Sequence, residues 1–164
     1  NTAVEMLSEV IRDAAELELP ALRAAVAEQG VDPIALAATL SCPVPVVLRR
    51  LAALPELGAG LITCTRTGDV LFRKPLGNDG VLAAIEADLQ AVLYAALGTS
   101  GIVLSQPIAS AQTRAQGLVC FATSEVRPAH RYNHAPALHA VMLITPDTGV
   151  AASLTAEHAG RIEL

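Results

Sequence analysis

Residues 60–73 have the sequence Gly60-Leu61-Ile62-Thr63-Cys64-Thr65-Arg66-Thr67-Gly68-Asp69-Val70-Leu71-Phe72-Arg73. β-Branched and apolar residues fill both ends of this stretch, which is typical of strands. Thr67-Gly68-Asp69 in the middle has the residue types of a tight hairpin turn. We therefore expect a β-hairpin with strands at Gly60–Thr65 and Val70–Arg73. Before residue 60, apolar residues recur at helical spacing. Residues 60–73 therefore mark the change from helices to a sheet.

Four helices are predicted before the hairpin, at residues 3–19, 20–29, 33–40 and 41–54. The first carries a stripe of apolar residues at helical spacing, namely Val4, Leu7, Val10, Ile11, Ala14 and Leu17. Asp32 is the expected N-cap of the third helix, with Pro33 at its first position. Ser41 is expected to cap the fourth helix, and Pro55 is expected to end it.

After the hairpin, the pattern predicts a helix at 81–97 and strands at 102–109, 117–126 and 137–145. The order is thus four helices followed by β-β-α-β-β-β. This order predicts an α+β fold, in which N-terminal helices precede a mainly antiparallel sheet with one inserted helix, as in GAF, PAS and profilin-like sensor domains. We expect an N-terminal helical segment (1–55), an α+β sensor domain (56–146) and a C-terminal tail (147–164).

The composition is that of an ordinary folded domain. A chain of 164 residues can bury a sizeable core, and 52% hydrophobic against 16% charged residues excludes a disordered segment. The formal net charge of −5 argues against nucleic acid as the main partner, because phosphate binding needs clustered Lys and Arg. The chain opens on Asn1-Thr2-Ala3 without an initiator Met, so we expect a piece of a longer protein.

The three cysteines, Cys42, Cys64 and Cys120, are odd in number and form no Cys-x-x-Cys pair. We expect all three to be reduced, which predicts a cytoplasmic protein. Pro, Gly or charged residues interrupt every apolar run before the roughly 18 residues that a membrane span needs. We therefore expect no signal peptide, no transmembrane segment and no membrane partner.

The sequence contains none of the familiar catalytic motifs. It has no Gly-x-Ser-x-Gly elbow, no phosphate-binding loop and no His-Glu-x-x-His. His130 and His134 have the spacing of a metal pair on a helix, but Pro128 and Pro136 flank them, so we interpret them as residues of a surface loop. We expect no catalytic residue, no metal and no cofactor, and an enzyme of unrecognised type remains an alternative.

Residues 34–52 have the outline of a helix-turn-helix, with 34–40 as the supporting helix and 43–52 as the recognition helix. A recognition helix must offer several polar or basic side chains to bases and phosphates. Only Arg49 and Arg50 qualify here, and the rest of the segment is apolar. We favour two packed core helices, with a DNA-contacting module as the alternative.

Two cationic clusters are candidates for holding an anionic group. Arg73 and Lys74 lie at a strand end, before the glycine-containing loop 76–80 and the helix at 81–97, where a phosphate or carboxylate could bind. Arg127 begins the second cluster, followed closely by His130 and Arg131. We expect the helix at 81–97 to cover the sheet, with a small organic ligand beneath or beside it.

Several segments resemble the C-terminal domain of short-chain fatty acyl-CoA regulators, which are bacterial transcription factors with an N-terminal helix-turn-helix of the XRE type. The resemblance lies in Leu-Ala-Ala-Thr-Leu (36–40), Val-Leu-Arg-Arg-Leu-Ala-Ala-Leu-Pro (47–55), Gly-Leu-Ile-Thr-Cys-Thr-Arg-Thr-Gly-Asp-Val-Leu-Phe-Arg-Lys-Pro (60–75), Tyr-Ala-Ala-Leu (94–97), Gln-Pro-Ile (106–108) and Ala-Val-Met-Leu-Ile-Thr-Pro (140–146). It covers most of residues 30–146.

This resemblance implies a ligand-sensing domain of a transcriptional regulator that binds an acyl-CoA or related small metabolite. It also implies that DNA is bound only by a separate domain outside this chain, and we expect a homodimer. The ligand-binding residues that we expect are Arg73, Lys74, Tyr94 and Arg127. Family members usually carry Cys-Pro-Leu-Trp in the helix before Tyr94, whereas this chain has Asp88-Leu89-Gln90-Ala91. We therefore expect no iron–sulfur cluster on its cysteines.

Overall fold

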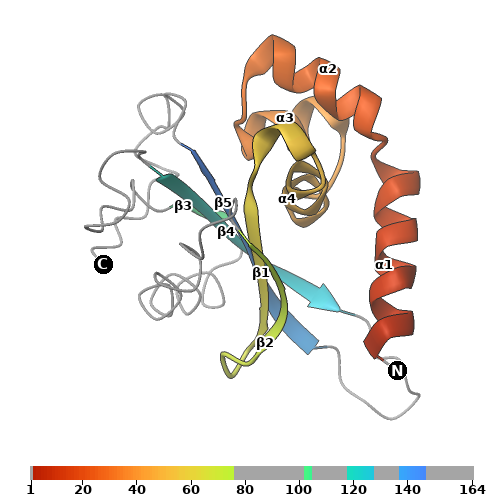
Figure 1. The fold of residues 1–164 in the computed structure, drawn as a ribbon, viewed down its shortest axis with the longest axis vertical. Coiled ribbons are helices and arrows are strands. Elements are labelled where there is room, and N and C mark those ends of the chain that lie inside the picture. Colours follow the sequence, from red (N-terminus) through yellow and green to blue (C-terminus); the bar gives the residue numbers. More distant parts are fainter. Residues whose placement is uncertain (1, 76–101, 105–117, 128–136, 147–164) are drawn as a thin grey trace.

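The computed structural model describes residues 2–75, 102–104, 118–127 and 137–146 (Figure 1). In these residues four helices precede a mainly antiparallel sheet, which confirms the predicted α+β class. The elements are α1 (Thr2–Glu16), α2 (Leu19–Gln29), α3 (Pro33–Leu40), α4 (Val44–Ala52), the 3₁₀ helix η1 (Pro55–Leu57), β1 (Gly60–Thr65), β2 (Val70–Lys74), β3 (Ile102–Leu104), β4 (Leu118–Arg127) and β5 (Ala137–Pro146). The predicted helix at 81–97 and the tail at 147–164 lie outside the described residues.

The described strands form one sheet in the order β2-β1-β5-β4-β3, and each neighbouring pair is antiparallel. The predicted hairpin is confirmed, because β1 pairs directly with β2. Its turn is closed by the amide of Thr65, which donates to the carbonyl of Asp69, and by the amide of Gly68, which donates to Thr65. Gly68 has a φ of 92°, a conformation that a residue without a side chain adopts at little cost.

The start of α3 follows the sequence prediction. Asp32 is its N-cap, and the carboxylate oxygen Oδ1 accepts hydrogen bonds from the amides of Ile34 (3.0 Å) and Ala35 (3.3 Å). Two of the amides that a helix start leaves unpaired are satisfied in this way.

The predicted N-cap of α4 was wrong by two residues. Ser41 ends α3 in a left-handed conformation, with φ 53°, and the N-cap of α4 is Pro43. The reason is local, since Ser41 already ends α3 and its left-handed backbone excludes the extended conformation that an N-cap residue takes.

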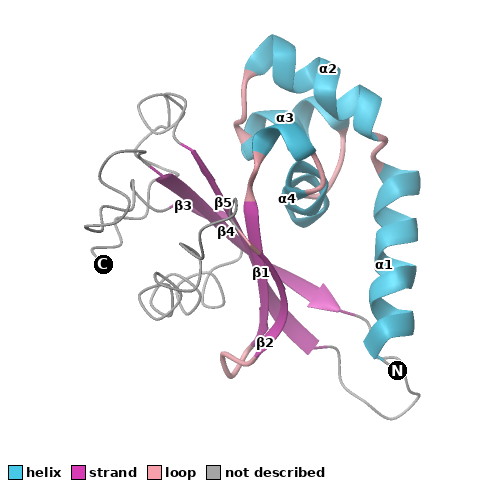
Figure 2. Cartoon of the chain, viewed as in Figure 1, coloured by secondary structure: helices cyan, strands magenta, loops and turns pink. Residues whose placement is uncertain are grey.

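The helices lie on one side of the sheet, and α4 packs on β1, β4 and β5 (Figure 2). The core between these layers joins residues of the helices to residues of the sheet. Its members from α4 and the strands are Val46, Val47, Leu48, Leu51, Ala52, Leu61, Phe121, Val141 and Leu143. This burial confirms the interpretation of 34–52 as packed core helices.

We expect Asp32→Ala to lower the free energy of unfolding by about 1 kcal/mol, because two amides at the start of α3 lose their acceptor. In a chain of this size that corresponds to a fall in Tm of roughly 2–4 °C. Thermal unfolding followed by circular dichroism measures the change, with Glu28→Ala on the exposed side of α2 as the control. An unchanged Tm for Asp32→Ala would contradict the capping role.

Candidate functional site

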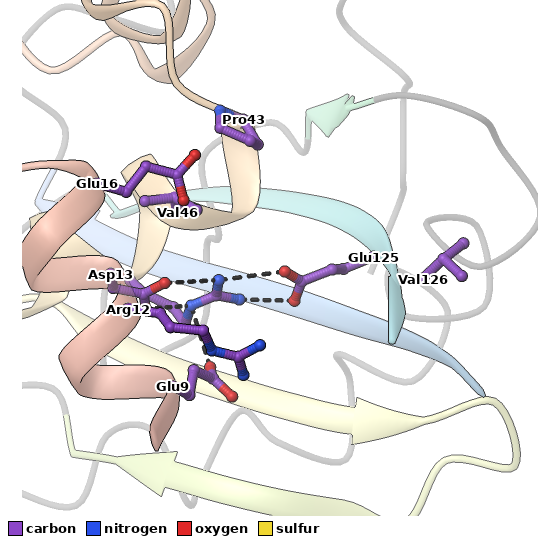
Figure 3. A pocket seen from close by; sticks show the side chains of 9 residues that line it. Glu9, Arg12, Asp13, Glu16, Pro43, Val46, Glu125 and Val126 are labelled. Atoms are coloured by element: carbon purple, nitrogen blue, oxygen red, sulfur yellow. Dashed lines mark hydrogen bonds and ion pairs between the residues drawn. The ribbon is translucent and has the colours of Figure 1, made fainter. Parts of the chain in front are cut away.

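Arg49 of α4 lies at the junction of α1, α4 and β4, where three carboxylates surround its guanidinium (Figure 3). Its Nε donates to Asp13 at 2.6 Å and lies 3.0 Å from an oxygen of Glu9. Its Nη1 donates to Glu125 at 2.6 Å, and its Nη2 donates to both Asp13 and Glu125 at 3.1 Å. The guanidinium is therefore bidentate toward two carboxylates that are 112 residues apart in the sequence, the geometry that arginine is shaped for.

The ion cluster is largely withdrawn from water. The side chains of Arg49 and Asp13 are 10% and 8% exposed. Burial by itself would lower the pKa of Arg49, but the hydrogen bonds and charges of Asp13 and Glu125 outweigh burial and raise it above its ordinary value. Arg49 is thus a permanent structural cation.

These contacts argue against α4 as a DNA-reading helix. The axes of α3 and α4 differ by 111°, which is close to helix-turn-helix geometry. However, Arg49 is bound by carboxylates, and Nε of Arg50 donates to the carbonyl of Leu17 at 2.8 Å. Both arginine side chains that the sequence offered for phosphates or bases thus already make contacts within the chain.

A pocket of about 170 Å³ lies beside the Arg49 cluster. It is lined by Glu9, Arg12, Asp13, Glu16, Pro43, Val46, Arg49, Glu125 and Val126 (Figure 3). Four of these side chains are acidic and two are basic, and the buried cation is occupied by its own carboxylates. The four carboxylates therefore outnumber the two cations of the lining, and only Arg12 lies outside the buried ion cluster, so the pocket does not favour the anionic ligand that the sequence suggests.

Lys74 performs a structural task that sequence analysis did not foresee. Its Nζ donates to the carbonyl of Ala52, the last residue of α4, and to the carbonyl of Ala59 at 2.9 Å. Burial lowers the pKa of this ammonium. Because the last carbonyls of a helix lack partners within it, Lys74 caps α4 and ties the edge strand β2 to it.

The sheet has two faces of different character, as the alternation of side chains along a strand requires. Leu61, Phe121, Val141 and Leu143 belong to the core under the helices. A second set of fully buried strand residues does not belong to that core, and we call it the second face. Its members are Ile62, Cys64, Ala122, Ala140, Met142 and Ile144.

Strand register confirms that the second face is continuous. Ile62 pairs with Met142, and Met142 pairs with Ala122. Cys64 lies opposite Ala140 in the next row on the same face. These rows span three neighbouring strands, and their apolar side chains are small (Cys64, Ala122, Ala140), flexible (Met142) or β-branched (Ile62). The prediction that residues 81–97 cover the sheet lies outside the described residues.

Register also separates the two predicted cations of β2. Arg73 pairs with Ile62 and so lies on the second face, whereas Lys74 pairs with Leu61 and lies on the helix-bearing face. The two side chains therefore leave the sheet in opposite directions and do not form a single anion site. Arg73 is exposed at the edge of the second face.

Of the remaining predicted ligand residues, the described structure places only Arg127, and it lies away from Arg73. Arg127 is the last residue of β4, and it pairs with Ala137 at the first residue of β5. Ala122 lies in the same row as Arg73, three strands away, and Arg127 follows Ala122 by five residues on β4. The backbones of Arg73 and Arg127 are therefore about 17 Å apart along the strands and about 14 Å apart across them. Tyr94, His130 and His134 lie outside the described residues.

Cys42 and Cys64 are free thiols, and Cys64 is buried. Burial raises the pKa of both thiols. Among the described side chains, no group of three His, Cys, Asp or Glu residues is placed to hold a metal ion. In the same residues no single helix is long and apolar enough to cross a membrane. Helices α3 and α4 reach that length and hydrophobicity only when they are taken together, and a bend of 111° separates them.

Comparison with solved structures places this geometry in context. The fold is similar to that of a Mycobacterium tuberculosis transcriptional regulator. The TM-score is 0.56 at 14% sequence identity, over 82% of this chain and 42% of the regulator, so this chain spans less than half of that protein's length. At this identity the likeness concerns the fold alone. No protein-family model and no curated protein matches the sequence.

We expect Arg49→Met to lower the free energy of unfolding by about 3–5 kcal/mol, because it leaves buried carboxylates without a counter-ion. The matched control is Arg23→Met, which breaks an equally short 2.6 Å ion pair with Glu56 whose partners are 47% and 53% exposed. That change is expected to cost less than about 1 kcal/mol. Urea unfolding measures both, and equal losses would refute the importance of the buried cluster.

We expect Cys64 to react more slowly with iodoacetamide than Cys42 at pH 8, because it is buried and the thiolate is the reactive form. A raised pKa means less thiolate at a given pH, so both alkylation rates should still be climbing above pH 9. Peptide mass spectrometry resolves the sites, and unfolding in urea should equalise them. Equal rates in the folded protein would show that the second face is open.

Proposed function

We propose that this chain is the ligand-sensing domain of a bacterial transcriptional regulator, binding an acyl-CoA or related small metabolite. The observation that carries the proposal is the second face, a fully buried apolar face of the sheet that is separate from the helix-side core. The fold likeness to part of a longer transcriptional regulator supports it, as does the sequence resemblance to acyl-CoA regulators. A GAF-, PAS- or profilin-like assignment belongs to the same proposal.

The chemistry of the second face suits a ligand with an apolar chain. Ala122 and Ala140 are small, and Met142 between them is flexible enough to repack around an acyl group. Apolar lining with few polar groups is typical of small-molecule sites. The acyl chain of the ligand would contribute apolar contact area at this face.

Arg73 gives the same face a cationic edge. It lies in the row Arg73–Ile62–Met142–Ala122, at the outer edge of the described sheet, and we assign to it the contact with a phosphate or carboxylate of the bound ligand. Lys74, held on backbone carbonyls, is assigned to stability instead. DNA contact is assigned to a separate domain of a longer protein.

Thermal shift with acetyl-, propionyl-, butyryl- and hexanoyl-CoA, free CoA and the corresponding acids tests the proposal. A ligand at a hundredfold over its Kd should stabilise the fold by roughly 2.7 kcal/mol, which is several degrees for a chain of this size. A preference for acylated over free CoA is expected, since the second face supplies apolar contact. No shift with any compound of the panel would overturn the acyl-CoA assignment.

We expect Arg73→Ala to weaken binding of the best ligand by about tenfold or more, because a charge-assisted hydrogen bond is lost. Arg66→Ala, an exposed arginine on the turn of the same hairpin, should leave the Kd unchanged. Lys74→Met should lower Tm without changing the Kd. Isothermal titration calorimetry measures these values, and an equal Kd for the Arg73 and Arg66 variants would contradict a head-group contact.

A further inference from the structure

Helix α1 shows an unusual distribution of polar and apolar side chains. The large apolar residues Val4, Leu7, Val10 and Ile11 are between 58% and 62% exposed. By contrast, the charged residues Glu9 and Asp13 are turned toward Arg49 and partly or fully buried. A surface helix normally buries its apolar stripe and exposes its charges, whereas α1 turns Glu9 and Asp13 inward and exposes these four apolar side chains.

The exposed residues form a regular seam. Val4, Leu7, Ile11 and Ala14 follow the 3-4-3 spacing of core positions in a coiled coil. The positions beside the seam are Ser8, Val10 and Ala15, none of which is charged. At about 100° per residue, the nearest charged side chain, Arg12, lies about 120° around the helix from the centre of the seam.

We propose that the seam Val4–Leu7–Ile11–Ala14 is a self-association surface at which α1 pairs with α1 of a second copy. Charge favours this occupant. An identical chain carries a net charge of −5, but the seam and its flanks present no charge, so two copies meet here without repulsion between like charges. The apolar residues also have the same spacing on both copies, so the side chains of one α1 can fit between those of the other.

The buried area sets the expected strength. Val4, Leu7 and Ile11 offer roughly 100 Å² each and the partly buried Ala14 adds little, which gives about 300 Å² per copy and about 600 Å² in total. Stable interfaces begin near 1,200 Å², so this pairing alone makes a weak, concentration-dependent dimer. The inference does not depend on the proposed ligand or on the second face.

Sedimentation velocity of the whole chain from about 5 to 500 μM provides the test. The apparent mass should rise with concentration from 16.9 kDa toward twice that value. Leu7→Glu combined with Ile11→Glu should raise the dimer dissociation constant at least tenfold while the circular dichroism spectrum and Tm stay unchanged, since both side chains are exposed. Leu71→Glu, an exposed apolar position on β2, is the matched control and should dimerise like the natural sequence.

Disulfide trapping identifies the surface directly. A parallel pair should trap Leu7→Cys as a homodimer, whereas an antiparallel pair should trap Leu7→Cys with Ile11→Cys, and either result supports the proposal. A chain that stays monomeric throughout the concentration series overturns it. So does a dimer that survives the double glutamate variant, because a different surface would then hold the copies together.

Discussion

One arginine holds the first helix, the fourth helix and the sheet together. Arg49 binds carboxylates from α1 and β4, and its guanidinium is almost completely withdrawn from water. Such an ion cluster adds little net stability compared with apolar packing, but it fixes orientation, since the hydrogen bonds exist in only one arrangement. Because Asp13 and Glu9 must face Arg49, α1 cannot rotate to bury its apolar stripe. The outward direction of Leu7 and Ile11 is therefore a consequence of the buried charge.

The sheet separates the task of stability from the task proposed for ligand binding. Its helix-bearing face completes the core through Phe121, Val141 and Leu143, and Lys74 anchors β2 to the end of α4 on that side. Its second face is apolar without taking part in that core, and Arg73 lies on its edge. Two adjacent cations thus have different roles because neighbouring residues of a strand point to opposite faces.

Local signals in the sequence were sufficient for much of the fold. The hairpin at 60–74, the Asp32 cap and the order of the described elements depend on neighbouring residues and are recognisable from residue types. The start of α4 was misplaced, because Ser41 ends α3 in a left-handed conformation and so cannot take the extended backbone of an N-cap. The Arg49 cluster was not predictable, since Glu125 is 76 residues away and only the tertiary fold brings it near. One sequence signal pointed to this cluster: Glu9 and Asp13 are one helical turn apart, so both carboxylates lie on the same side of α1.

Helices α3 and α4 illustrate why shape alone does not assign a function. Their 111° bend reproduces the geometry of a DNA-binding motif, and the sequence supplies two consecutive arginines on the second helix. A DNA-reading helix needs those cations to be exposed, because phosphate binding depends on releasing counterions from the nucleic acid. Here carboxylates from α1 and β4 already neutralise Arg49, and a backbone carbonyl binds Arg50. The same angle between helices therefore serves packing against the sheet, and the surroundings of the two arginines distinguish this case from a DNA reader.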